Sequence, residues 1–257
     1  MAAQGTDTRM DRPAPTIDTS VDTRTRPRAD ARTGTGWGWP FLATIGLGGF
    51  ALITWVVASK TVIPFDKPLL DAAAGLGQYM VAWRDLSDSA NIPLIVIGVA
   101  IVAFLLFTGK RAEAVLVIGV LAAVTAGSEA VKLLVARPRP PGFTNDAAGV
   151  VYSYPSGHVL EAVTIYGIIA ILLWRSSLPT VIRVLVPIVF SVLIAFVAVA
   201  RVAVGAHFPS DVLAGFLAGI GCLALFAIFS GMLARHRAAA RPSRSSAAPA
   251  ASDSSSS

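Results

Sequence analysis

Six stretches of about 20 residues, each poor in charged side chains, constrain the fold of this chain more than any other feature. They fall near residues 39–59, 92–108, 113–131, 158–175, 182–200 and 211–234. A helix of this length matches the hydrocarbon thickness of a bilayer. The chain is 54% hydrophobic and only 14% charged, which is more apolar than a typical soluble domain. We therefore expect an all-α polytopic membrane protein with a six-transmembrane-helix bundle.

The two ends of the chain have the composition of disordered tails. Residues 1–36 contain six Arg and five Asp among Thr, Pro and Ala, with no apolar periodicity. Residues 235–257 are first basic and then rich in Ser and Ala. The membrane domain is therefore expected over residues 37–234. Residues 64–83 carry charged side chains in a weak apolar pattern, and we interpret them as an interfacial or loop helix and not as a seventh span.

Small residues within the last apolar stretch also carry information. Gly215 and Gly219 are four positions apart, which permits the close approach of a neighbouring helix. Cys222 is the lone cysteine, so the sequence excludes an internal disulfide and a multi-cysteine metal site. We expect Cys222 to act as a small buried apolar side chain.

The Lys and Arg residues predict the orientation of the chain in a cell (inner) membrane. With both termini in the cytoplasm, 14 of the 21 cationic residues lie on the inner side. The outer ones are Lys60, Lys67, Arg84, Lys132, Arg137, Arg139 and Arg201. The positive-inside rule thus predicts cytoplasmic tails. The net charge of +6 does not indicate nucleic-acid binding, because the Arg residues lie in flanks and loops and form no basic helix face.

Three of the outer cations stand at the ends of spans and predict an anion site. They are Lys132, Arg139 and Arg201. Snorkelling explains one such cation, but three of them with two histidines nearby are not expected by chance. Ser156 and Gly157 precede the fourth span, where Ser suits a helix N-cap and Gly admits a ligand close to the backbone. The free amides and the dipole of that helix end attract a phosphate.

Of the two histidines, His158 directly follows Gly157, and His207 lies just before the sixth span. His207 and Asp211 are four residues apart, so a helical or turn backbone can bring carboxylate and imidazole together. A carboxylate on one ring nitrogen fixes the tautomer and leaves the other nitrogen free to attack. From this pair alone, Asp211 could equally be a simple N-terminal charge of a helix.

Together these segments resemble the signature of the type 2 phosphatidic acid phosphatase superfamily, which includes lipid phosphate phosphatases and vanadium haloperoxidases. The residues that carry the match are Lys132, Arg139, Pro140, Pro155–His158, Arg201, His207 and Asp211. The chain departs from the signature at Ala200, where Ser is usual, and it adds Arg137 within the first spacer. The resemblance covers about 80 residues. It implies an acid phosphatase/vanadium haloperoxidase-like core.

The resemblance implies a role for each matched residue. His207 looks like the nucleophile that forms a phosphohistidine, Asp211 like its orienting partner, and His158 like the general acid. The implied phosphate-binding residues are Lys132, Arg139, Ser156, Gly157 and Arg201. Because these cations supply the electrostatics, the resemblance implies no metal ion and no cofactor. The implied substrate is a membrane lipid phosphate or pyrophosphate, such as phosphatidic acid, phosphatidylglycerol phosphate or undecaprenyl pyrophosphate.

For several polar and aromatic residues near the motifs, the sequence allows two different roles. Glu129 and Glu161 either tune the site or form an intramembrane ion pair that orients the bundle. Tyr152, Tyr154 and Phe143 either line a lipid access path or belong to an interfacial aromatic belt. The alternative function is a non-catalytic lipid-binding or flipping protein of the same fold, which predicts the loss of a catalytic residue; none is lost. A haloperoxidase shares the anion pocket, but those enzymes are generally soluble.

Overall fold

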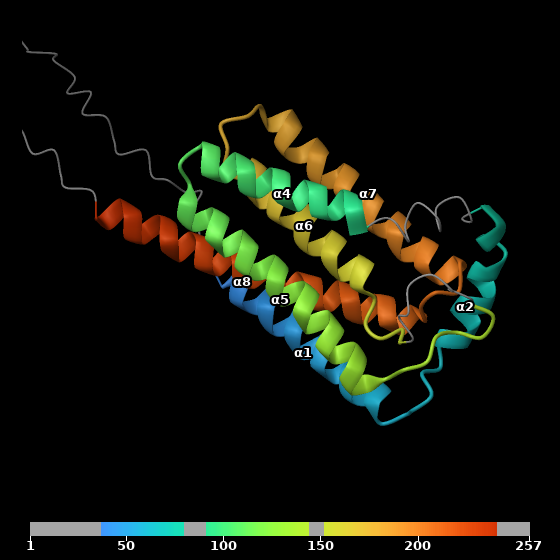
Figure 1. Cartoon of the computed structure of the whole chain (residues 1–257). Coiled ribbons are helices and arrows are strands. Elements are labelled where there is room, and N and C mark those ends of the chain that lie inside the picture. Colours follow the sequence, from blue (N-terminus) through green and yellow to red (C-terminus); the bar gives the residue numbers. More distant parts are fainter. Residues whose placement is uncertain (1–36, 80–90, 144–151, 241–257) are drawn as a thin grey trace, which may run out of the picture. The chain divides into compact units, whose positions relative to one another are not determined.

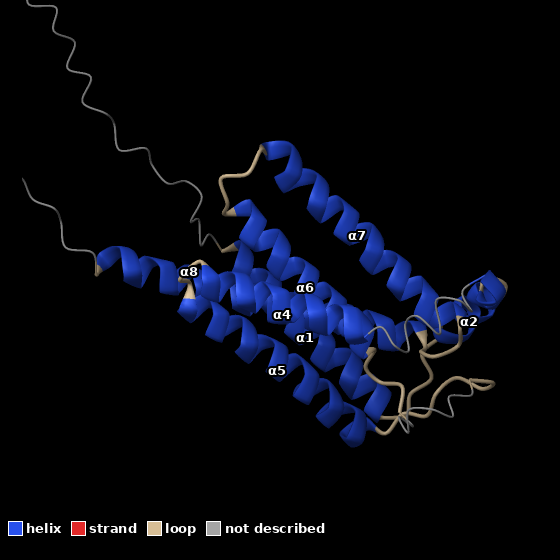
Figure 2. Cartoon of the chain, turned by 45° about the horizontal axis from the view of Figure 1, so that its top comes forward, coloured by secondary structure: helices blue, strands red, loops and turns tan. Residues whose placement is uncertain are grey.

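The computed structural model describes residues 37–79, 91–143 and 152–240, and its long elements are all helices (Figure 2). They are α1 (Gly38–Ala58), α2 (Asp66–Ala74), α4 (Asn91–Phe107), α5 (Arg111–Val135), α6 (Gly157–Trp174), α7 (Thr180–Ala203) and α8 (Pro209–Ala239). The predicted tail 1–36 and most of the predicted tail 235–257 lie outside the described residues.

The predicted all-α membrane fold is confirmed. Five helices, α1, α5, α6, α7 and α8, are long and apolar enough to span a bilayer, and α4 adds an apolar helix of 17 residues. The six predicted spans therefore each coincide with a helix. Along α7 large apolar side chains point outward, as expected of a surface that lies against lipid and not water.

The helix ends differ from the predicted span ends in ways that matter for the site. α5 continues to Val135, so Lys132 lies in its last turn, and α7 continues to Ala203, so Arg201 is inside its last turn. α8 begins at Pro209, a favoured first helical residue, and ends five residues beyond the predicted domain boundary. Three motif-bearing helix ends are thereby brought to one end of the bundle.

The helix α8 packs against α1, α6 and α5 and forms the centre of the bundle (Figure 1). Close approach depends on glycine. A Cβ atom at Gly46 of α1 would lie 2.5 Å from the backbone nitrogen of Gly221, and one at Gly215 would lie 2.5 Å from the carbonyl oxygen of Ser156. The predicted close contact at Gly215 is therefore confirmed, and it presses the start of α8 onto the start of α6.

The short helix α2 lies beside the ends of α7 and α8. It falls within residues 64–83, for which the sequence predicted a helix that does not span; residues 80–83 lie outside the described part. Lys67 and Asp71 form an exposed ion pair on this helix, with 2.7 Å between Nζ and Oδ2. Asp66 is different, because it is only 5% exposed and points into the protein.

Candidate active site

Backbone hydrogen bonds hold the three motif segments together at one end of the bundle. The Ser156 amide, just before α6, donates to the Asp211 carbonyl in the first turn of α8 (3.0 Å). The Ser153 amide donates to the Arg137 carbonyl (2.9 Å), which joins the segment before α6 to the segment after α5. The His207 amide donates to the Arg201 carbonyl (3.2 Å) and so holds the turn between α7 and α8. The site is built on main-chain contacts between distant parts of the chain.

The His207 imidazole is buried and oriented by a backbone carbonyl. Its Nδ1 lies 2.7 Å from the Ser153 carbonyl oxygen. Because a carbonyl only accepts, Nδ1 carries the proton and donates it, which leaves a lone pair on Nε2. Burial lowers the pKa of His207, and the nearby Arg139 and Arg201 lower it further, while the Asp211 carboxylate opposes them. The neutral, nucleophilic form of the ring is therefore favoured.

The Asp211 carboxylate is fully buried but does not make the predicted direct hydrogen bond to His207. Its Oδ2 lies 3.8 Å from Nδ1, which is too far for a hydrogen bond but close enough for an ion pair when the ring is protonated. That oxygen accepts from the Phe208 amide (2.9 Å), and Oδ1 accepts from Nη1 of Arg137 (2.5 Å). The acceptor on Nδ1 is therefore a backbone carbonyl, which side-chain identities do not reveal, and the orienting role of Asp211 stays a prediction.

The start of α6 has unoccupied hydrogen-bonding capacity. Ser156 takes the N-cap position as predicted, but its hydroxyl makes no capping bond and has no hydrogen-bond partner among the described residues, although it is buried. The Ser128 hydroxyl, in α5, is in the same state. A Cβ atom on Gly157 would lie 3.4 Å from the Ser128 oxygen and 3.7 Å from Nζ of Lys132. Buried polar atoms without a partner are costly, so these groups suit a polar ligand such as an anion.

The remaining predicted cations are placed around this region by contacts of their own. Nη1 of Arg139 donates to the Ala206 carbonyl (2.8 Å), beside His207, and its guanidinium stacks on the Phe143 ring at 4.8 Å. Arg201 is buried in the last turn of α7. Nζ of Lys132 donates to Oε1 of Glu129 (2.6 Å). Of Glu129 and Glu161, for which the sequence allowed two interpretations, Glu129 therefore pairs with a predicted phosphate-binding cation.

His158 and Tyr154, both from the second motif segment, differ in their burial. His158 is half-buried in the first turn of α6. Tyr154 is completely buried, so neither the lipid path nor the aromatic belt is correct for it. Its hydroxyl shares a 2.8 Å hydrogen bond with Thr54 and its ring stacks on Phe50, which ties the second motif to α1. Burial raises the pKa of Tyr154 to about 12, so the phenol stays neutral.

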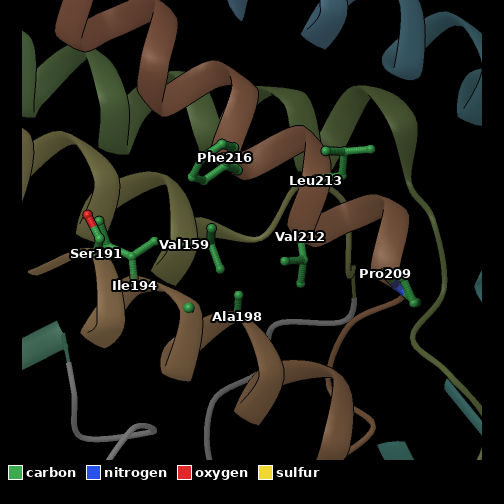
Figure 3. Close-up of a pocket in the computed structure, with 9 residues that line it drawn as sticks. Val159, Ser191, Ile194, Ala198, Pro209, Val212, Leu213 and Phe216 are labelled. Atoms are coloured by element: carbon green, nitrogen blue, oxygen red, sulfur yellow. The ribbon is translucent and has the colours of Figure 1, made fainter. Parts of the chain in front are cut away.

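An apolar pocket of about 450 Å³ opens beside the site between α6, α7 and α8 (Figure 3). Val159 borders it from α6, Ile194 and Ala198 from α7, and Val212 and Phe216 from α8. Val159 directly follows the histidine of the second motif, and Val212 directly follows the aspartate of the third. The pocket volume lies within the range of small-molecule sites. An apolar group attached to an anion at the motifs could therefore extend into it.

Fold and site together define a multi-pass membrane protein with a cationic, histidine-containing site at one end of its helices. Residues 113–235, which include most of α5 to α8, match the family model of the PAP2 superfamily. This agrees with the resemblance in the motifs. The comparison with curated proteins found no match.

A solved structure supports the fold beyond the family domain. The transmembrane PAP2 type phosphatidylglycerolphosphate phosphatase from Bacillus subtilis is 25% identical to this chain, with a TM-score of 0.58. The alignment covers 74% of this chain and 98% of that one. The bundle as a whole, including the helices before residue 113, is therefore similar to that of a membrane PAP2 enzyme.

Proposed function

We propose that this protein is a lipid phosphatase that hydrolyses a phosphomonoester or pyrophosphate of a phospholipid or polyprenyl lipid. The observation that carries the proposal is the His207 imidazole, held by the Ser153 carbonyl with its Nε2 lone pair available. It lies in a buried site with Arg139 and Arg201 close enough to affect its pKa. An oriented neutral imidazole beside fixed cations suits attack on a phosphoryl group.

The proposed reaction has two steps. Nε2 of His207 forms a bond to phosphorus while the bond from phosphorus to the lipid oxygen breaks, and His158 gives that oxygen a proton. The oxygen of a water molecule then forms a bond to phosphorus while the bond from phosphorus to Nε2 of His207 breaks. His158 accepts a proton from that water, and inorganic phosphate leaves. Each charge-assisted hydrogen bond to the transferring phosphoryl oxygens contributes about 1.5–3 kcal/mol. We assign these bonds to Lys132, Arg139, Arg201, Ser156 and the Gly157 amide.

The proposal of a lipid substrate is supported by the surroundings of the site. The apolar pocket between α6, α7 and α8 adjoins the second and third motifs, as an acyl or prenyl chain requires. The similar Bacillus subtilis protein is a phosphatidylglycerolphosphate phosphatase, so that lipid belongs first among the substrates to test. We propose that no metal ion takes part, because the cations of the chain provide the positive charge. Activity that depends strictly on a divalent ion would contradict this.

Phosphate release by detergent-solubilised protein tests the proposed activity. The assay should compare phosphatidic acid, phosphatidylglycerol phosphate and undecaprenyl pyrophosphate, each with and without chelator. His207→Ala should abolish release while the protein still inserts into membranes. His236→Ala is the matched control, because this exposed histidine lies in the last turn of α8, away from the motifs. Equal loss in both variants, or retained release in His207→Ala, would remove the nucleophile assignment.

We further propose that the site faces the outside of the cell membrane and that both termini are cytoplasmic. Labelling of single cysteines in intact cells tests this in a Cys222→Ala background. A cysteine at Asp71, which is exposed on α2, should react with a membrane-impermeant maleimide. One at Ser177, which is exposed in the turn between α6 and α7, should react only after lysis. The reverse pattern would invert the orientation.

A further inference from the structure

A buried ion-pair chain behind the candidate site involves two residues that the family signature does not include. Nη2 of Arg137 lies 2.7 Å from Oδ2 of Asp66, and Nη1 lies 2.5 Å from Oδ1 of Asp211. The guanidinium also stacks on the Phe208 ring at 4.1 Å. Both carboxylates are buried, so one arginine fork bridges two acidic groups that come from α2 and α8.

Both oxygens of the Asp66 carboxylate are held by hydrogen bonds from Ser210. Its Oδ1 accepts from the Ser210 amide (2.8 Å), a free donor at the start of α8, and its Oδ2 accepts from the Ser210 hydroxyl (2.7 Å). The same hydroxyl oxygen accepts from Nη1 of Arg137 (2.8 Å). The carboxylate therefore fixes both the arginine fork and the first turn of α8, which carries Asp211.

Arg137 is also connected to the imidazole through its main chain. Its carbonyl accepts from the Ser153 amide (2.9 Å), and the Ser153 carbonyl holds Nδ1 of His207 (2.7 Å). One residue thus touches the carboxylate beside His207 with its side chain and holds the acceptor of the imidazole proton with its backbone. Movement of Arg137 would therefore displace both the carboxylate beside the ring and the carbonyl that holds Nδ1.

We propose that Asp66 and Arg137 are a positioning pair, which holds Asp211 and the His207 ring in the geometry required for phosphoryl transfer. The inference rests on the proposed function of the site. Neither residue needs to touch the substrate. Asp66 pairs with Nη2 of the fork, so Arg137 meets Oδ1 of Asp211 through Nη1, while Oδ2 of Asp211 accepts from the Phe208 amide beside the imidazole. Supporting residues of this kind tune an active group as much as its direct contacts do.

The isosteric change Asp66→Asn tests the pair. It should lower kcat per folded protein by about 10-fold or more while leaving the KM for the lipid nearly unchanged. It should also move the acidic limb of the kcat profile to lower pH. Among the described residues, the charged groups that act on the pKa of His207 are Asp211, Arg139 and Arg201. Without Asp66, Arg137 is balanced by Asp211 alone, so a protonated His207 is stabilised less.

Three companion variants separate positioning from simple stabilisation of the fold. Asp71→Asn makes the same change at an exposed position of the same helix and should behave like the parent. Arg137→Lys keeps the charge but lacks the fork, and should resemble Asp66→Asn. Asp66→Glu restores the carboxylate and should recover part of kcat. If Asp66→Asn lowers only the yield or the melting temperature, and leaves kcat per folded protein and the pH limb unchanged, the proposal is overturned.

A readout without turnover keeps the inference separate from the proposed function. In ¹⁵N-histidine-labelled protein, the Nδ1–H proton of His207, assigned by its loss in His207→Ala, reports the bond to the Ser153 carbonyl. Asp66→Asn should shift this signal and Asp71→Asn should not. If the parent protein releases no phosphate from any lipid, the proposed function fails, but the shift still tests the positioning. An unchanged signal in Asp66→Asn contradicts it even in an active enzyme.

Discussion

Gly215→Ala is expected to damage the site more than it damages the fold. The added Cβ would lie 2.5 Å from the carbonyl oxygen of Ser156 and 3.4 Å from the amide nitrogen of Leu160. Both are backbone atoms, so no flexible side chain can move aside. A Cβ atom needs a contact distance of at least 3.0 to 3.4 Å from such an atom. The starts of α6 and α8 must therefore move apart by about 0.5–0.9 Å from the 2.5 Å contact.

That displacement acts directly on the proposed chemistry. Ser156 is bonded through its amide to the Asp211 carbonyl, so separation of the two helices stretches this contact as well. A misplacement of about 1 Å can cost about 100-fold in rate, so we expect kcat/KM to fall roughly 10- to 100-fold. Overpacking should also cost about 1–3 kcal/mol, offset in part by the better helix propensity of alanine.

The measurement is phosphate release per folded protein beside thermal unfolding in the same detergent. Gly127→Ala on α5 is the matched control, because a Cβ atom there meets nothing within 4 Å. It should keep full activity and be as stable as the parent or slightly more so. If Gly215→Ala keeps parental kcat/KM, the starts of α6 and α8 do not form one precisely spaced site, and the reasoning is refuted.

Two further outcomes follow from the pocket and from the buried imidazole. Ala198→Trp should fill the pocket and raise the KM for long-chain lipid phosphates about 10-fold. This corresponds to the lost burial of about two methylene groups of the lipid chain at about 0.8 kcal/mol each. Hydrolysis of a short soluble phosphate ester should not change. Val199→Trp, on an exposed position outside the pocket, is its control, and equal effects of the two would argue against chain binding there. Because burial lowers the pKa of His207, the active neutral ring should persist into acid, so the acidic limb of kcat/KM should lie below pH 6.5. Asp211→Asn removes the carboxylate that opposes this shift and should move the limb lower still; a limb above pH 6.5 would contradict the assigned environment.

The spans and the motif positions were predictable because local signals specify them. Stretches of bilayer length that are poor in charged side chains predict the spans, and a proline predicts the start of α8. Both signals lie in residues that are neighbours in the sequence. The glycine contact at Gly215 was also visible, because two glycines four positions apart mark a close helix crossing. The motif spacing likewise selected Arg139, whose side chain reaches the carbonyl just before His207.

The supports of the site were not predictable, because they join distant residues or use backbone atoms. Asp66 and Arg137 are 71 positions apart, and the weak apolar pattern around Asp66 suggested an interfacial charge. The acceptor of the His207 proton is the Ser153 carbonyl, which has no signature in side-chain types. The one available signal was Arg137 itself, a second arginine two residues before the matched one, at a membrane end where an unpaired cation is costly.

Rapid-quench trapping of a phosphoenzyme tests the central claim most directly. Protein mixed with ³²P-labelled lipid substrate and quenched in base should retain label on His207, lost on acid treatment and located by peptide mass spectrometry. The label should be absent from His207→Ala and present in His236→Ala. Label on another residue, or full turnover by His207→Ala, would contradict the assignment of His207 as the nucleophile.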